Sequence, residues 1–441
     1  MKIRNLTVAA FVLLLFVGIL YWSEHRKPLD EAAKASADVP HTILKLDEGT
    51  ITKVELKKKN AEPIVLTKSN SGTWQIALPK PLNADQSAVS SVISTLSSLN
   101  SDRLVGDKVA DVRQYGLDYP SLEVDITEKD TKAQRLLIGD ETPAGSAVYA
   151  MVGDDPRVFT MAGYKKTSID KSLNDLRDKL LLTTTADKIS RVQLIRKDQE
   201  IEFGRNKDEW QILKPRPLRA DSIQVGELVR QLADARMDLS SSDGDGKETV
   251  SAFDKAAPIA IVEVTDQSGT QELQVRKNKD TYYAKSSALE GTYKVGSDLG
   301  QALDKGLDEF RNKKLFDFGF NDLAMIEMHS GSTACFLTKS GPDWWSNGKK
   351  MDSGAVQSYI SDLRDLAATK FVESGFTNPM IEVAVTSDAG KRVERVSIAK
   401  SGSSYIAKRE NELTLYQVDS SVVDGLQKAA ADIKPASTAR K

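Results

Sequence analysis

The sequence WQIALPKPLNADQSAVSSVISTLSSL (Trp74–Leu99) predicts a strand, a proline-containing loop and a helix in succession. Asp85 is a favourable N-cap, because its carboxylate can accept hydrogen bonds from the free N–H groups of the first helical turn. Apolar residues then recur with the period of an amphipathic helix, at Val89, Val92, Ile93, Leu96 and Leu99. The stretch therefore predicts a capped helix that packs one face on a core.

The same arrangement occurs twice more along the chain. Trp210 leads through a proline-rich loop to Asp221 and to a second stripe, formed by Val225, Leu228, Val229, Leu232 and Ala235. Trp344 and Trp345 lead through a shorter loop to Asp352 and to a third stripe, formed by Val356, Tyr359, Ile360, Leu363 and Leu366. Because three stripes share one spacing behind the same cap, we interpret the chain as a tandem repeat of a domain-sized unit.

The segments around these helices predict the α+β fold class. Short alternating runs come in groups, which favours a mostly antiparallel sheet with two helices per repeat on one face. A closing helix is expected in each repeat, with Ile169, Leu173, Leu176 and Leu180 on one face in the first. The predicted boundaries are 42–182, 183–318 and 319–434 for the three α+β repeats, followed by a disordered tail at 435–441.

The N-terminal region predicts a membrane anchor. Leu6–Trp22 contains no charged residue, and at about 1.5 Å per residue it covers most of a hydrocarbon core about 30 Å thick. We predict an N-terminal transmembrane helix at 1–22 and a polar tether at 23–41, with the N-terminus in the cytoplasm. The three repeats would then lie in the periplasm, or otherwise outside the cytoplasm, and the helix would span the inner membrane once. A cleaved signal peptide is the alternative, with small residues at Ala35 and Ala37.

The composition excludes several classes of function. The 61 Lys and Arg residues nearly balance the 63 Asp and Glu residues, so the overall charge does not favour nucleic acid. A single cysteine, Cys335, excludes an internal disulfide and a multi-thiolate zinc site, and three histidines are few for a metal centre or a triad. We expect no metal, no cofactor and no enzymatic activity. A hydrolase that works through carboxylates is the alternative that the residue types leave open.

The repeated signature residues Trp74, Asp85, Trp210, Asp221, Trp345 and Asp352 are the candidate interaction residues. For the aspartates, capping of a helix explains both residue type and position. The tryptophans, at strand ends, either pack on the following helix or form a platform on which a sugar stacks. If the tryptophans pack on the helices, we predict a scaffold that binds envelope proteins. If they form a platform for sugars, we predict a module that binds a cell-envelope glycan.

Several motifs together resemble a bacterial family called domain of unknown function 4340. They are the W-x-I…P…AD signature, YGL-D-x-P at Tyr115–Pro120, IGD-x-TP-x-G at Ile138–Gly145, the Tyr149-Ala150 pair and LRDK at Leu176–Lys179. Members of that family are often encoded beside ABC transporter subunits of the gliding-motility type. The resemblance therefore implies a membrane partner, an ABC transporter permease, and it provides no catalytic residues.

Overall fold

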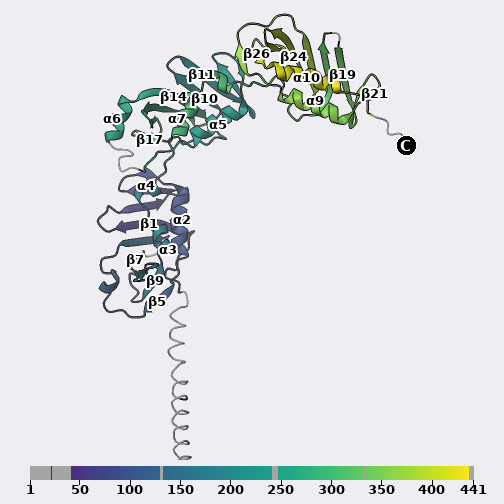
Figure 1. Ribbon diagram of the computed structural model, residues 1–441. Coiled ribbons are helices and arrows are strands. Elements are labelled where there is room, and N and C mark those ends of the chain that lie inside the picture. Colours follow the sequence, from purple (N-terminus) through teal and green to yellow (C-terminus); the bar gives the residue numbers. More distant parts are fainter. Residues whose placement is uncertain (1–20, 22–40, 130–132, 241–246, 332, 437–441) are drawn as a thin grey trace, which may run out of the picture. The chain divides into compact units, whose positions relative to one another are not determined.

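The computed structural model describes residues 21, 41–129, 133–240, 247–331 and 333–436 (Figure 1). Three antiparallel sheets follow one another along this part of the chain. The chain divides into two compact units, Met1–Lys179 and Leu180–Lys441. The first sheet belongs to the first unit, and the second and third sheets belong to the second unit.

The first unit contains a nine-stranded sheet of order β4-β3-β2-β1-β6-β7-β8-β9-β5. Its strands are β1 (Ile51–Lys58), β2 (Ile64–Lys68), β3 (Trp74–Leu78), β4 (Leu82–Asn83), β5 (Arg103–Gly106), β6 (Leu122–Glu128), β7 (Gln134–Glu141), β8 (Ala147–Val152) and β9 (Val158–Ala162). Its helices are α2 (Gln86–Ser97), α3 (Gly163–Ile169) and α4 (Leu173–Leu176), with a 3₁₀ turn η1 (Arg113–Tyr115).

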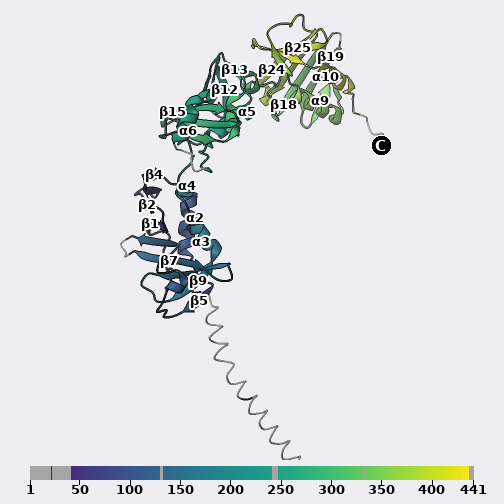
Figure 2. The ribbon, with the colours of Figure 1, turned by 60° about the vertical axis from the view of Figure 1, so that its left-hand side comes forward.

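The two faces of this sheet differ in chemistry, as alternation along a strand requires. Val54 and Leu56 of β1 are fully buried on the side of the helices, where α2 contacts α3 (Figure 2). On the opposite face, the carboxylate of Asp125 lies 2.6 Å from the Lys57 ammonium and 2.7 Å from the Arg135 guanidinium. The core therefore lies between the sheet and the helices, and ion pairs cover the other face.

The second unit contains repeats 2 and 3, with sheet orders β13-β12-β11-β10-β14-β15-β16-β17 and β21-β20-β19-β18-β23-β24-β25-β26-β22. Repeat 2 has strands β10 (Arg191–Arg196), β11 (Gln199–Asn206), β12 (Glu209–Lys214), β13 (Leu218–Arg219), β14 (Ala257–Asp266), β15 (Gly269–Asn278), β16 (Thr281–Ser286) and β17 (Tyr293–Val295). Repeat 3 has strands β18 (Leu323–Ser330), β19 (Thr333–Ser340), β20 (Asp343–Ser346), β21 (Lys349–Lys350), β22 (Lys370–Val372), β23 (Ile381–Ser387), β24 (Arg392–Ser401), β25 (Ser404–Arg409) and β26 (Leu415–Val418).

Repeat 2 has α5 (Ser222–Ala233), α6 (Lys247–Lys255), α7 (Ser297–Asp304) and α8 (Leu307–Phe310), and repeat 3 has α9 (Ser353–Asp365), α10 (Ser420–Asp432) and a 3₁₀ turn η2 (Asp388–Gly390). The helices that enclose the core again lie on one face of each sheet (Figures 1 and 2), whereas α6 of repeat 2 packs its Phe253 against Tyr283 on the other face. Eight strands have the same order in all three sheets, and the first and third sheets add a ninth strand, β5 or β22, at one edge. The prediction of three tandem repeats is confirmed.

The predicted fold class is wrong in placing an N-terminal transmembrane helix before the repeats, because no helix of the described residues is long and apolar enough to cross a membrane. Strand residues make up 43% of the described chain and helix residues 23%, so the repeats are mostly antiparallel sheet. The expected closing helix is a single helix, α10, in repeat 3, but it is divided into two short helices in repeats 1 and 2. In repeat 1, Ile169 ends α3, and Ser172 then starts α4 through a capping box with Asp175. In repeat 2, Gly306 separates α7 from α8. A helical spacing of apolar residues thus persisted across a break in the helix.

The predicted transmembrane helix is not among the helices of this fold. Within the described residues, no helix is long and apolar enough to cross a membrane. Of the predicted anchor at 1–22 and tether at 23–41, all but Tyr21 and His41 lies outside the described residues. At the other end, Ala436 N–H donates to the Lys350 carbonyl over 2.9 Å, and residues 437–441 lie outside the described part.

Candidate functional site

The three signature aspartates cap the three helices that follow them. The Asp85 carboxylate accepts hydrogen bonds from the N–H groups of Ser87 (3.0 Å) and Ala88 (3.1 Å). Asp221 does the same for the two corresponding N–H groups of α5, and Asp352 accepts from Ala355 N–H over 2.8 Å. Each aspartate thus stabilises a helix start, as the capping interpretation requires.

The signature tryptophans mostly belong to the core. Trp74 is 6% exposed and Trp210 is 8% exposed, so neither ring offers a face on which a sugar can stack. In repeat 3, Trp345 is 38% exposed, whereas Trp344 is 3% exposed. Trp344 pairs with Lys339 as Trp210 pairs with the corresponding Arg205. Trp344 is therefore the equivalent of Trp210, and Trp345 lies on the other face of its strand.

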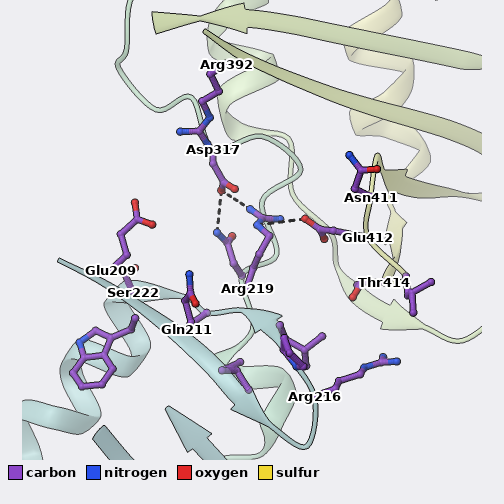
Figure 3. A pocket seen from close by; sticks show the side chains of 17 residues that line it. Glu209, Gln211, Arg216, Arg219, Ser222, Asp317, Arg392, Asn411, Glu412 and Thr414 are labelled. Carbon is purple, nitrogen blue, oxygen red and sulfur yellow. Dashed lines mark hydrogen bonds and ion pairs between the residues drawn. The ribbon is translucent and has the colours of Figure 1, made fainter. Parts of the chain in front are cut away.

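Charged side chains from repeats 2 and 3 line a cleft of about 720 Å³ in the second unit (Figure 3). Repeat 2 contributes Arg219, at the end of β13, and the side of repeat 3 contributes Asp317 and Glu412. The segment 314–318 is counted here with repeat 3, because its Leu315, Phe316 and Phe318 side chains lie in the core of that repeat. We call Arg219, Asp317, Glu394, Arg409, Glu412 and Tyr416 the charged cluster. Sequence reasoning did not identify it.

Arg219 connects the two repeats through four groups of repeat 3. Its guanidinium forms an ion pair with Asp317 and lies 3.8 Å from a carboxylate oxygen of Glu412 (Figure 3). It also donates to the Lys314 carbonyl over 2.8 Å and to the Tyr416 hydroxyl over 3.3 Å. Burial disfavours the charged guanidinium, but the neighbouring Asp317 and Glu412 carboxylates outweigh it and raise the pKa of Arg219.

Arg409, at the end of β25, binds the same carboxylates from the side of repeat 3. Its guanidinium lies 3.2 Å from Asp317 and 2.7 Å from Glu412, and it donates to the Leu315 carbonyl. The buried Glu394 carboxylate accepts a hydrogen bond of 2.6 Å from the Asp317 N–H. Two guanidiniums and three carboxylates thus share one network, as buried charges require.

Tyr416 completes the network without providing a reactive group. Its hydroxyl donates to the Glu412 carboxylate over 2.7 Å. Burial, with the charge of Glu412, raises the pKa of Tyr416 to about 12. A phenol with that pKa is a poor base at neutral pH. The arrangement is suited to joining two domains, because its acids and bases are occupied by one another.

A second contact supports the same junction. The Arg311 guanidinium lies 3.5 Å from the centre of the Phe371 ring, a cation–π contact. It also donates to the Thr414 hydroxyl over 3.3 Å and pairs with Asp308 of its own repeat at 2.9 Å. Repeats 2 and 3 are therefore held together by two sets of partly buried cationic contacts.

A sequence signal for the charged cluster does exist in the repeat alignment. The loop before the capped helix ends Leu82-Asn83-Ala84 in repeat 1 and Leu218-Arg219-Ala220 in repeat 2. A charge gained at one repeat position, inside an otherwise matching segment, marks a residue that the repeated fold itself does not need. In the part of the chain that the structure describes, no group of three His, Cys, Asp or Glu residues has the arrangement of a metal site.

Comparison with known proteins gives one match. The family model of a domain of unknown function (DUF4340) matches residues 74–217 and, a second time, residues 210–384. Both matches begin at the tryptophan of the repeated signature, Trp74 and Trp210. No curated protein and no solved structure matches the chain.

Proposed function

This chain belongs to the DUF4340 family, and from that premise we propose that it is a non-catalytic accessory protein that binds a partner protein at a membrane, outside the cytoplasm. A permease of the ABC transporter class is the partner that the family resemblance implies. The role is that of a scaffold, in which the repeats provide the binding surfaces.

The charged cluster is the observation on which the proposal depends. A catalytic cleft holds groups that are poised to bind or exchange protons with a substrate. In the charged cluster beside this cleft, the Arg219 and Arg409 guanidiniums are bound to Asp317 and Glu412, and Tyr416 donates to the same Glu412. These groups lock repeat 2 to repeat 3, which supports a protein that presents surfaces over one that transforms a substrate.

The proposed location is supported by the sequence of the N-terminal region. Leu6–Trp22 has no charged residue, and Lys2 and Arg4 precede it. An apolar segment of this kind, next to basic residues at the N-terminus, is typical of chains that reach the membrane with their bulk exported. We propose that this segment keeps the repeats close to a membrane partner.

Crosslinking in intact membranes tests the proposal. Cells that express the full chain are treated with a short amine-reactive crosslinker, and the protein is recovered with an antibody to it and analysed by mass spectrometry. We expect one membrane protein in a stoichiometric amount, and its loss when residues 2–22 are deleted. Recovery of the protein alone from both samples would overturn the proposal.

A further inference from the structure

Repeat 3 contains a cavity at a place that repeats 1 and 2 fill with core side chains. The cavity has a volume of about 350 Å³. Its lining combines the apolar side chains of Met328, Cys335, Leu337, Met351 and Ile433 with the polar side chains of Ser330, Thr333, Ser346 and Gln427. It lies between the strands β18–β20 and the C-terminal end of α10. We call it the repeat-3 socket.

Two of the lining residues are smaller than their equivalents in repeat 2. Cys335 pairs with Met328 as Ile201 pairs with Leu194, so Cys335 and Ile201 are equivalent. Ile201 is completely buried, whereas Cys335 is partly exposed. Ser346 follows Trp345 as the buried Ile212 follows Gln211 on the corresponding strand. Both changes remove apolar volume from the same part of the core.

A third change removes the side chain that closes this part of the core. In repeat 2 the Phe310 carbonyl accepts a hydrogen bond of 2.8 Å from the N–H of the capping Asp221. The Phe310 ring is completely buried, with its centre 5.0 Å from that of Phe203. In repeat 3 the equivalent carbonyl, bonded to Asp352 N–H over 2.9 Å, is that of Lys434, and its side chain is exposed.

The chemistry of the missing side chain indicates what the socket accepts. Repeat 1 fills the position with Leu176 and repeat 2 with Phe310, both completely buried. An apolar cavity of about 150 Å³ is enough to bind a benzene molecule in a protein core. At about 350 Å³, the repeat-3 socket therefore has room for a leucine or phenylalanine side chain.

Three lysines adjoin lining residues of the socket in the sequence: Lys428 follows Gln427, Lys434 follows Ile433, and Lys349 lies two residues before Met351. Lys349, Lys428 and Lys434 are exposed, and none has an ion pair among the described residues. Lys350 already pairs with Asp343 at 2.9 Å, and Asp432 is the acidic residue next to Ile433. An apolar side chain with carboxylates beside it would complement this surface in both shape and charge.

We propose that the repeat-3 socket binds a leucine or phenylalanine side chain of the partner protein, from a segment in which acidic residues flank that side chain. The inference rests on the proposed function, because it specifies where the accessory protein holds its partner. In repeats 1 and 2 the equivalent position is filled by a side chain of the chain itself, and in repeat 3 we expect a side chain of the partner to fill it.

A peptide competition on the full chain tests the site directly. Cys335 is the single cysteine of the chain and lines the socket, so its rate of alkylation by a maleimide reports on occupancy. At millimolar concentration, the peptide acetyl-Asp-Glu-Phe-Asp-Glu-amide should slow alkylation at least fivefold. The same peptide with alanine in place of phenylalanine should not. Equal effects of the two peptides would overturn the proposal.

A variant separates this site from the proposed function as a whole. Lys434→Phe restores the residue type of repeat 2, so it should raise the melting temperature and slow Cys335 alkylation without peptide. Lys391→Phe, at an exposed lysine outside the socket and its neighbouring lysines, is the matched control and should do neither. In crosslinked membranes, the wild type should recover the partner and Lys434→Phe should not. Recovery by both would leave the proposed function intact and refute the socket, whereas recovery by neither would overturn both.

Discussion

Replacing Arg219 with methionine tests the role of the charged cluster. The substitution keeps an unbranched side chain but removes the ion pair with Asp317, the approach to Glu412 and the hydrogen bond to the Lys314 carbonyl. Breaking a fully buried pair costs about 3–5 kcal/mol, and an exposed pair about 0–1 kcal/mol. The side chains of Arg219, Asp317 and Glu412 are 20%, 27% and 24% exposed, so we expect a loss of about 2 kcal/mol, between these limits.

Hydrogen exchange with mass spectrometry measures this loss locally, which matters because a chain of several domains has no single unfolding transition. A loss of about 2 kcal/mol corresponds to about 30-fold lower protection. We expect that decrease in peptides from Arg392–Arg409 and no change in repeat 1. Arg216→Met is the matched control, because Arg216 lines the same cleft and has no ion pair within the described chain.

A double-mutant cycle with Asp317→Asn then separates the pair from its surroundings. Residues in one ion-pair network show coupling energies of about 0.5–3 kcal/mol, and we expect a value above 1 kcal/mol for this pair, which is in direct contact. Equal protection in Arg219→Met and Arg216→Met, together with no coupling to Asp317, would refute the claim that the charged cluster joins the repeats.

Three further predictions concern the cap, the phenol and the core. Asp221→Ala removes two capping hydrogen bonds and should destabilise α5 by about 1 kcal/mol, seen as faster hydrogen exchange in that helix. The pKa of Tyr416 is raised to about 12, so its contribution to stability is complete below about pH 10 and is lost as the pH rises toward 12; ultraviolet titration should show a late-titrating phenolate that Tyr416→Phe removes. Phe310→Ala empties a completely buried site and should cost about 3–5 kcal/mol in chemical denaturation, whereas Phe320→Ala, at a 91% exposed ring, should change stability by less than about 0.5 kcal/mol.

Each of these expectations has a contrary outcome. Unchanged exchange in α5 would mean that the cap contributes nothing to this helix. A tyrosine titration that is complete by about pH 11 would contradict the burial of Tyr416 beside Glu412, because an unperturbed phenol titrates near pH 10. Equal losses for the two phenylalanine variants would contradict the packing of Phe310 on Phe203.

The capped helices could be predicted because both of their signals are local. Val89, Val92, Ile93, Leu96 and Leu99 are all buried, and Asp85 makes the predicted cap. Both signals depend only on neighbours in sequence. One is the helical spacing of the apolar residues, and the other is a carboxylate that accepts hydrogen bonds from the N–H groups two and three residues later. The same holds for the corresponding helices of repeats 2 and 3.

Local sequence signals could not predict the break in the closing helix of repeat 1 or the exposure of Trp345. The apolar spacing of Ile169, Leu173 and Leu176 fits one helix, yet Ser172 starts a new one because its capping box with Asp175 competes with helix continuation. Between the adjacent Trp344 and Trp345, only strand register decides which ring enters the core, and register depends on the partner strand β19.

The charged cluster and the repeat-3 socket depend on residues far apart in the sequence. Arg219 and Glu412 meet only once both repeats are folded and docked. Lys434 looks like an ordinary surface lysine until the backbone hydrogen bond to Asp352 shows that it occupies the place of Phe310. Comparing the repeats position by position, with the strand register known, is what reveals both features.

The native mass of the protein extracted from its membrane in mild detergent tests the central claim most directly. The chain alone has a mass of 48.3 kDa. If it is an accessory protein held on a partner, native mass spectrometry will show a complex whose excess mass matches a second polypeptide, and that complex will be absent for Lys434→Phe. If all of the extracted protein has the mass of the chain or a multiple of it, the account of a partner-binding scaffold is contradicted.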